Sequence, residues 1–276
     1  MQILKDLAPI EYFPYLEVGR KHQKGGQPIL SWESLPILAG DYRAGEAAPN
    51  YLIVASDLQG LVEERGSYQL MGEVLPTYLQ LVLEESYELT QEDTIGVILA
   101  GDLYTHPSKR GANGEVGTVW QAFKETFDWV VGVAGNHDRM EEVKPDFWDE
   151  KTLLLHQNQI EIQDLTLAGI GGIIGQPSKP QRTAEKNYLQ ALQTLLNNNP
   201  DLLILHETPD YPPLDYMGNA AIRAVVEQAT SPTTLITGHC HWEEPLVQLE
   251  NGITILNADT RVIILEKETS TISPTP

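Results

Sequence analysis

Side chains that can bind a metal ion or transfer a proton follow one of the short apolar runs of the chain. The run at residues 129–134 leads directly into Gly135, Asn136, His137 and Asp138. Asparagine offers a neutral amide oxygen, histidine an imidazole that ligates metals or moves protons, and aspartate a carboxylate that can orient the imidazole. This tetrapeptide predicts a chemical site at the end of a strand.

Four further apolar runs end in residues of the same kind. They lead into Asp-Leu-Gln at 57–59, Gly-Asp at 101–102, a histidine at 206 and Gly-His-Cys-His at 238–241. In open α/β sheets, ligands bind outside the carboxyl ends of the strands. We therefore expect one set of side chains to converge at that edge: Asp57, Gln59, Asp102, Asn136, His137, His206, His239 and His241. Because neighbouring side chains in an extended segment point to opposite faces, Cys240 is expected to face the core.

The converging donors suffice for a pair of metal ions. Carboxylates, side-chain amides and histidines from these runs can hold two divalent cations that share one aspartate. This is the arrangement of a two-metal hydrolase, in which ions ~3.5 to 4 Å apart clamp the attacking and leaving oxygens. Two such ions set against Asp57 and Asp102 leave a net positive charge, which favours a phosphate as the bound group.

The overall charge narrows the classes of partner. The chain has 39 acidic and 18 basic residues and a formal net charge of -21, which repels long nucleic acids and anionic membranes. A small phosphorylated substrate can still bind where metal ions reverse the local potential. The single cysteine, Cys240, excludes an intramolecular disulfide and favours a reducing compartment. Since no apolar run approaches the ~20 residues of a membrane helix, we expect a soluble protein of the cytoplasm.

Alternating strands and helices must position these residues. Apolar runs at 51–56, 95–100 and 129–134 predict strands that are buried along their whole length. The other elements that the pattern predicts are helices at 74–88 and around Trp120, Phe123 and Phe127, short strands within 152–172, a helix at 183–196, a strand at 201–205, a helix at 220–229 and a strand at 233–237. This alternation argues for a parallel sheet covered on both faces.

The two ends of the chain follow other patterns. Residues 1–50 contain five prolines and only short strand candidates, such as 11–17, so they either wrap over the core or form an oligomer contact or a lid. Near the other end, Asn251 and Gly252 predict a two-residue hairpin turn, and residues 261–265 a last strand. We expect an N-terminal extension at 1–50, one domain at 51–268 and a tail at 269–276.

The order of the motifs resembles the calcineurin-like metallophosphoesterase superfamily, whose pattern is Asp-x-His, Gly-Asp, Gly-Asn-His-Asp/Glu, His and Gly-His-x-His. The resemblance spans about residues 51 to 265 and implies an α/β fold in four layers, with two mixed β-sheets flanked by helices. It also implies ligand sets for two metals. The first ion would be held by Asp57, Gln59, Asp102 and His241, and the second by Asp102, Asn136, His206 and His239. His137 would donate a proton to the leaving oxygen, oriented by Asp138.

One position departs from the family pattern. Gln59 stands where the family usually has histidine, and its neutral oxygen is a harder donor, which favours Mn²⁺ or Mg²⁺ over Zn²⁺ or Cu²⁺. Manganese-dependent ADP-ribose/CDP-alcohol diphosphatases are similar at this motif. We therefore expect two divalent ions, with Mn²⁺ preferred and Mg²⁺, Fe²⁺ or Zn²⁺ as alternatives, and a phosphodiester or a nucleotide-type diphosphate as substrate. Alternatively, Gln59 weakens the first site, and the protein is a weak or inactive member that serves as a metal-dependent binding or scaffold protein.

Candidate substrate contacts surround these motifs. His106, Lys109 and Arg110 belong to a loop that could meet the outer phosphate or sugar of a substrate, or could be a solvated surface loop. Arg139 could contact phosphate or pair with a neighbouring glutamate. Trp242 could stack on a base, or could form a buried wall of the site.

Overall fold

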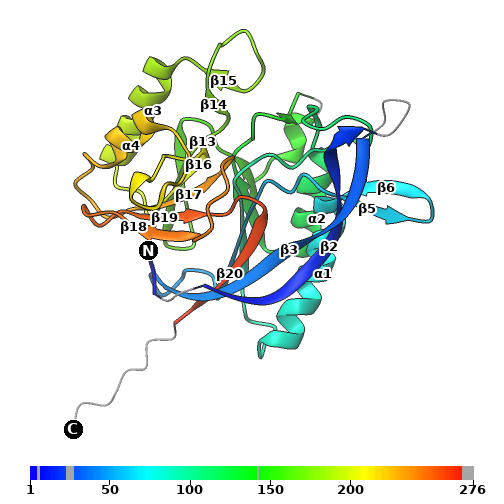
Figure 1. The fold of residues 1–276 in the computed structure, drawn as a ribbon. Coiled ribbons are helices and arrows are strands. Elements are labelled where there is room, and N and C mark those ends of the chain that lie inside the picture. Colours follow the sequence, from blue (N-terminus) through cyan, green and yellow to red (C-terminus); the bar gives the residue numbers. More distant parts are fainter. Residues whose placement is uncertain (5–6, 23–27, 142, 269–276) are drawn as a thin grey trace.

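Two β-sheets pack face to face, and helices cover their outer faces (Figure 1). The computed structural model describes residues 1–4, 7–22, 28–141 and 143–268. The tail that we predicted at 269–276 lies outside the described residues. In the described part of the chain, none of the helices has the length and apolar character needed to cross a membrane.

The larger sheet has ten strands of mixed direction. Its order is β11 (Thr152–Leu154), β9 (Trp129–Gly132), β7 (Ile95–Leu99), β4 (Tyr51–Ser56), β20 (Arg261–Lys267), β3 (Pro28–Arg43), β2 (Ala8–His22), β5 (Leu61–Glu64) and β6 (Ser67–Leu70), with β1 (Gln2–Ile3) paired to β3. β4, β7 and β9 run parallel, so their carboxyl ends meet at one edge.

The smaller sheet has six strands, and it is also mixed. Its order is β12 (Asn158–Ile162), β13 (Leu165–Ile170), β16 (Leu202–Glu207), β17 (Thr234–Gly238), β19 (Thr254–Asn257) and β18 (Leu246–Gln248). β13, β16, β17 and β19 run parallel. Two short pairs complete the described strands: β8 (Gly114–Glu115) with β10 (Asp138–Arg139), and β14 (Ile173–Ile174) with β15 (Arg182–Thr183).

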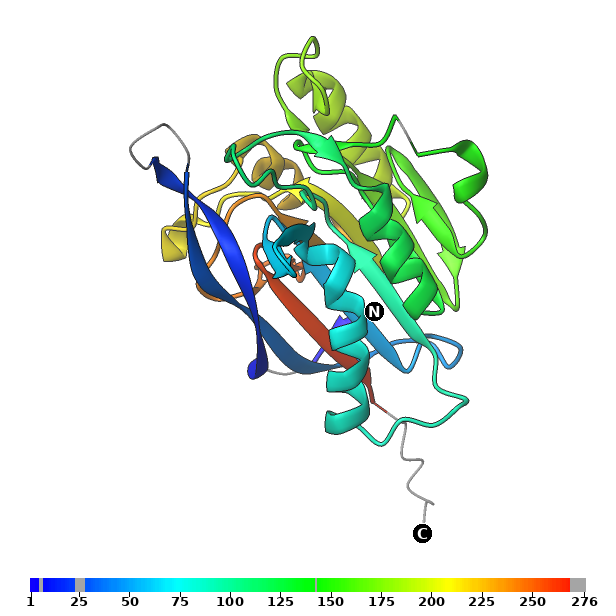
Figure 2. The ribbon, with the colours of Figure 1, turned by 90° about the vertical axis from the view of Figure 1, so that its right-hand side faces the viewer.

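Three separate apolar cores define the layers. One lies between the larger sheet and the helices α1 (Met71–Ser86) and α2 (Gly117–Thr126), which stand in front of that sheet in Figure 2. The second joins the inner faces of the two sheets, for example Val54 and Ile98 with Ile204 and Ile236. The third lies between the smaller sheet and the helices α3 (Glu185–Asn197) and α4 (Ala220–Val226). The predicted four-layer sandwich is therefore confirmed.

The single covered sheet expected from hydrophobic periodicity is wrong. A strand that is apolar along its whole length is buried on both faces, but its sequence does not show whether a helix or another sheet covers the second face. Val54 and Ile98 pack against the smaller sheet, whereas their neighbours Ile53 and Val97 pack under α1 and α2.

The first fifty residues contribute strands to the larger sheet. β2 and β3 form a long antiparallel hairpin, and β3 pairs in parallel with β20 from Ile37 to Tyr42. Phe13 and Tyr15 are buried, while the alternating residues Tyr12 and Pro14 are exposed, as expected for a half-buried strand. The sheet therefore runs without a break across the boundary that we predicted at residue 51.

The hairpin of β18 and β19 is present, but its turn is longer than predicted. Leu249 N–H donates to Ile253 O, and Gly252 N–H donates to Leu249 O, which leaves three residues in the loop. A two-residue type I′ turn needs positive φ at both central residues. Gly252 has φ 87°, whereas Asn251 is not among the positive-φ residues of the described chain.

Candidate metal centre

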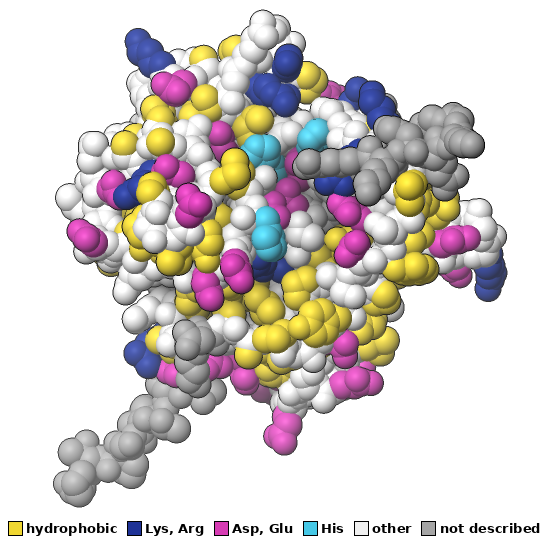
Figure 3. All heavy atoms as spheres, in the orientation of Figure 1, with side chains coloured by type: hydrophobic (Ala, Val, Ile, Leu, Met, Phe, Trp, Pro, Cys, Tyr) yellow, Lys and Arg dark blue, Asp and Glu magenta, His cyan; other side chains and the backbone are white. Residues whose placement is uncertain are grey.

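The predicted ligands surround a pocket of about 460 Å³ at the edge where the strands end. In the space-filling view, histidines and acidic side chains gather around a hollow in the middle of this face (Figure 3). Asn136 and His206 are buried, and His206 contacts both Asn136 and Asp102. The residues that line the pocket are Tyr15, Glu17, Val18, Asp57, Gln59, Asp102, Thr105, Arg110, Gly111, His137, His239, His241, Asp259 and Thr260.

Three of the candidate ligands have a left-handed backbone. The φ angles of Asp57, Asp102 and His239 are 55°, 54° and 67°, in a region that side-chain-bearing residues seldom adopt. Such a conformation costs on the order of 1–3 kcal/mol and persists only where the surrounding structure holds it. The bond from Asp57 N–H to Gly101 O, at 2.9 Å, is part of that hold. At each of these three residues, the strained backbone turns the chain sharply at the end of a strand.

The glycines that precede the ligands allow the loops to pack closely. A Cβ atom at Gly135 would lie 2.1 Å from the backbone nitrogen and Oδ1 of Asp102. At Gly238, a Cβ would lie 2.5 Å from Oδ2 of Asp57. No larger residue fits these positions unless the loops move, so glycine is required there for the ligands to converge.

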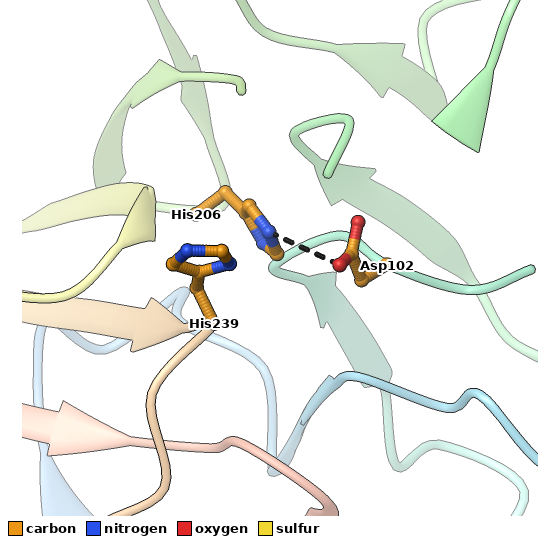
Figure 4. A group of neighbouring side chains, drawn as sticks. All are labelled: Asp102, His206 and His239. Carbon is orange, nitrogen blue, oxygen red and sulfur yellow. Dashed lines mark ion pairs between the residues drawn. The ribbon is translucent and has the colours of Figure 1, made fainter. Parts of the chain in front are cut away.

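Asp102, His206 and His239 form the tightest cluster of candidate ligands (Figure 4). Their ligand atoms all lie within 4.8 Å of one another. Nε2 of His206 lies 3.5 Å from Oδ2 of Asp102 and 3.2 Å from Oδ1 of Asn136. Nδ1 of His206 donates to the carbonyl oxygen of Ala100 at 2.8 Å, which turns Nε2 toward the cluster. Carboxylate, amide and imidazole donors at this spacing fit a divalent cation.

The electrostatics of the cluster call for positive charge. Burial alone would lower the pKa of His206, but the charges of Asp102 and Asp57 and the hydrogen bond to Asp102 raise it to about 10. Burial, together with the charge of His206, lowers the pKa of His239 to about 4. Burial and the nearby charge of Asp259 raise the pKa of Asp57 well above its usual range. Buried carboxylates in such numbers are stabilised by a bound cation.

The predicted ligands of the first metal border the same pocket. Oδ2 of Asp57 accepts hydrogen bonds from Oγ of Ser56 at 2.7 Å and from the backbone N–H of His239 at 2.9 Å. Nε2 of Gln59 lies 3.4 Å from Oδ2 of Asp102. The two ends of an amide are distinguished only by their hydrogen bonds, and the reversed amide would present Oε1 to a cation. His241 completes this side of the pocket.

The predicted role of Asp138 is wrong. Its carboxylate does not orient His137 but accepts three backbone N–H groups, from Asp102, Leu103 and Gly135, each at 2.8 Å. Nδ1 of His137 is buried and has no hydrogen-bond partner among the described residues. His137 still lines the pocket, so its ring can reach a bound substrate.

Of the predicted substrate contacts, only Arg110 lines the pocket. Its Nη1 donates to Oε1 of Glu17 at 2.5 Å and to the carbonyl oxygen of Val18 at 2.9 Å. His106, Lys109 and Arg139 are not among the lining residues, and both Lys109 and Arg139 are exposed.

Trp242 does not stack on a substrate, because it is fully buried. Its ring stacks on Tyr216 with centroids 5.2 Å apart, and its Nε1–H donates to Met217 O at 2.9 Å. Trp242 is buried, as the alternative expected, but it belongs to the core beside the smaller sheet and is not among the residues that line the pocket.

Sequence reasoning missed two groups of lining residues. Tyr15, Glu17 and Val18 come from β2, in the N-terminal extension, from which we predicted no site residue. Asp259 and Thr260 precede β20, which runs antiparallel to β4 with Arg261 opposite Ser56. The beginning of an antiparallel strand lies beside the carboxyl ends of its parallel neighbours, so a search restricted to carboxyl ends does not find it. The one signal for them in the sequence was that Asp259 and Thr260 form a polar pair between two apolar runs.

A family model and several solved structures are similar to this chain. The family Calcineurin-like phosphoesterase matches residues 51–243, which is more than half of the chain. Among solved structures, TT1561 of Thermus thermophilus is 15% identical, with 77% of this chain and 91% of that chain covered and a TM-score of 0.49. A hypothetical protein from Thermus thermophilus is 17% identical, with 75% of each chain covered and a TM-score of 0.43. Haemophilus influenzae NAD nucleotidase is 11% identical, with 76% of this chain and 50% of that chain covered and a TM-score of 0.41.

No curated protein matches the chain in sequence. The family match begins with β4 and ends just beyond His241, so it includes every predicted metal ligand. On this match, the chain belongs to the calcineurin-like phosphoesterase family.

Proposed function

We propose that the protein is a dinuclear-metal-dependent phosphoesterase that hydrolyses a small phosphorylated substrate. The position of Asp102 carries this proposal. One oxygen, Oδ2, faces Nε2 of His206 at 3.5 Å on one side and the amide of Gln59 at 3.4 Å on the other. Since these two side chains belong to different predicted ligand sets, their shared approach to one oxygen supports Asp102 as a bridging ligand.

The two ligand sets share this aspartate. Bound divalent ions would polarise the phosphoryl oxygens and supply a nucleophile from water near neutral pH. We assign Asp57, Gln59, Asp102 and His241 to the first ion, and Asp102, Asn136, His206 and His239 to the second. Gln59 supplies an oxygen in place of an imidazole, which supports Mn²⁺ as the preferred metal.

His137 is the proposed proton donor to the leaving oxygen. Its ring lines the pocket, while its backbone N–H donates to Oδ1 of Asp102 at 2.8 Å, which fixes its position beside the bridging carboxylate. General acid catalysis of this kind contributes on the order of 10²–10⁴-fold. Asn136 serves as a ligand through Oδ1, and its amide N–H groups can stabilise charge on the phosphoryl group.

The pocket favours a small substrate over a polymer. Its volume of about 460 Å³ lies within the range of roughly 300–1,000 Å³ that small-molecule sites occupy. A net charge of -21 repels long nucleic acids. We therefore favour a phosphodiester or a nucleotide-type diphosphate, and the single cysteine supports the cytoplasm as the compartment.

One observation favours a second candidate function. The amide of Gln59 can donate from Nε2 to Oδ2 of Asp102, and in that orientation it is a partner of the carboxylate and not a ligand of the first ion. A weak first site would make the protein a metal-dependent binding or scaffold protein that lacks catalysis.

Release of nitrophenol from bis-p-nitrophenyl phosphate separates the two functions. If the protein is a phosphoesterase, Mn²⁺ should stimulate this release, EDTA should abolish it, and the Asp102→Asn variant should lack it. The hydrolase would be refuted if the wild type binds Mn²⁺ but releases nitrophenol no faster than Asp102→Asn does. That result would support the scaffold.

A further inference from the structure

The segment that leads into β20 supplies two buried charged residues beside the metal centre. Asp259 and Arg261 are 7% and 4% exposed. A parallel bridge joins Ser56 to Asp259, and Ser56 also pairs with Arg261 across β4 and β20. Both residues lie beyond residues 51–243, the part that matches the family. The match therefore gives them no role.

Asp259 holds one edge of the His241 ring. Nδ1 of His241 lies 3.3 Å from Oδ1 of Asp259 and 3.2 Å from its carbonyl oxygen. A backbone carbonyl oxygen can only accept, so this contact fits the tautomer in which Nδ1 carries the proton and Nε2 keeps its lone pair. Thr260 fixes the carboxylate in turn, since its Oγ1 donates to Oδ1 of Asp259 at 2.9 Å.

Arg261 lies against the same ring. Its Nη2 is 3.2 Å from Nδ1 and 3.1 Å from Nε2 of His241. A nearly equal approach to both nitrogens within the ring plane would collide with the carbon between them, so the guanidinium lies over the ring face. Nη2 also donates to the carbonyl oxygen of Trp242 at 2.6 Å, which anchors the backbone next to the histidine.

His241 needs such support more than the other candidate ligands do. Its side chain is 58% exposed, so packing does little to restrict the ring. His206, in contrast, is fully buried and oriented by the carbonyl oxygen of Ala100. A carboxylate that accepts from the second nitrogen of a metal-binding histidine fixes its tautomer and increases its basicity, and the loss of such a partner typically costs about 10–100-fold in metal affinity.

We infer that Asp259 is a positioning residue of the first metal site, which presents Nε2 of His241 to the ion and supports a ligand set in which glutamine replaces a histidine. This inference rests on the proposed dinuclear function. Asp259 acts through His241, and the second ion, held by Asn136, His206 and His239, does not depend on it.

Titration of the metal-free protein with Mn²⁺, followed by calorimetry and by the electron paramagnetic resonance of free Mn²⁺, tests the inference. The wild type should bind two ions. In Asp259→Ala, one ion should bind about 10–100-fold more weakly, with the other unchanged. Asp259→Asn keeps a neutral acceptor oxygen and should show a smaller loss of the same ion, so it decides the matter if the alanine variant does not fold.

A double-mutant cycle with His241→Ala shows whether Asp259 acts through the histidine. In the His241→Ala background, Asp259→Asn should weaken the first ion no further. The matched control is Glu243→Gln, which removes one negative charge two positions from His241 at an exposed side chain outside the pocket. This control should bind both ions with wild-type affinity.

The outcomes separate the inference from the function on which it rests. A wild type that binds no Mn²⁺ defeats the proposed function. If the wild type binds two ions, three results would overturn the role of Asp259 and leave the dinuclear centre intact. These are unchanged affinities in Asp259→Asn, equal weakening of both ions in that variant, and additive losses in the double mutant.

Discussion

Oδ2 of Asp138 accepts the backbone N–H of Asp102 at 2.8 Å, directly beneath the carboxylate proposed to bridge the metals. The same oxygen accepts the N–H of Gly135, and Oδ1 accepts that of Leu103. Asp138 therefore joins the loop after β7 to the loop after β9. The last residue of the Gly-Asn-His-Asp motif thus holds the backbone of a proposed ligand in place.

Replacement of Asp138 by asparagine should destabilise the protein. Asparagine has one oxygen where aspartate has two, so at least one buried N–H loses its acceptor, at a cost of about 1–3 kcal/mol. We expect the free energy of unfolding in urea, measured in EDTA, to fall by that amount. Asp128→Asn is the control, because Asp128 accepts a single N–H, from Ile95, at an exposed position. The control should change stability by no more than about 0.5 kcal/mol. Equal effects of the two substitutions would contradict this role for Asp138.

His137→Ala should lower turnover and leave metal content unchanged. If the ring protonates the leaving oxygen, kcat should fall by about 10²–10⁴-fold with an alkyl leaving group. The loss should be smaller with p-nitrophenolate, which leaves without a proton. Elemental analysis should still find two metal ions per chain. His106→Ala, at a histidine outside the pocket, should match the wild type. An equal loss with both leaving groups would exclude His137 as the acid.

Arg110→Ala should weaken substrate binding. Among the described residues that line the pocket, Arg110 alone is a lysine or arginine, and Glu17 holds it at the rim. Loss of one charged hydrogen bond to phosphate should raise KM about tenfold, with a smaller change in kcat. The neighbouring Lys109 is exposed and does not line the pocket, so Lys109→Ala is a matched control. If both variants raise KM equally, the general charge of the loop and not a specific contact is responsible.

The strands and the residues at their ends could be predicted from the sequence. Apolar runs such as 51–56 and 129–134 are unambiguous as buried strands, and the carboxyl ends of parallel strands share one edge. Asp57 and Asp102 follow from that rule, and so does His206, although it lies in the other sheet. The contacts of Asp138 did not follow, because neighbouring positions in a motif need not share a face.

The N-terminal hairpin could not be predicted because its prolines argue against strands. Pro14 is tolerated because β2 pairs with β5 only at Leu16, so most of its second edge needs no hydrogen-bond donor. Pro36 lies just before Ile37, where the pairing of β3 with β20 begins. These exceptions depend on which strands are neighbours, which local sequence does not record.

Metal stoichiometry in the wild type and in Asp102→Asn tests the central claim most directly. Both proteins are loaded with Mn²⁺, freed of excess metal by gel filtration and measured by elemental analysis, with circular dichroism to show that the variant is folded. Because Asp102 belongs to both proposed ligand sets, we predict two ions per chain in the wild type and a loss of both in the variant. Two ions retained by folded Asp102→Asn would contradict the bridged centre.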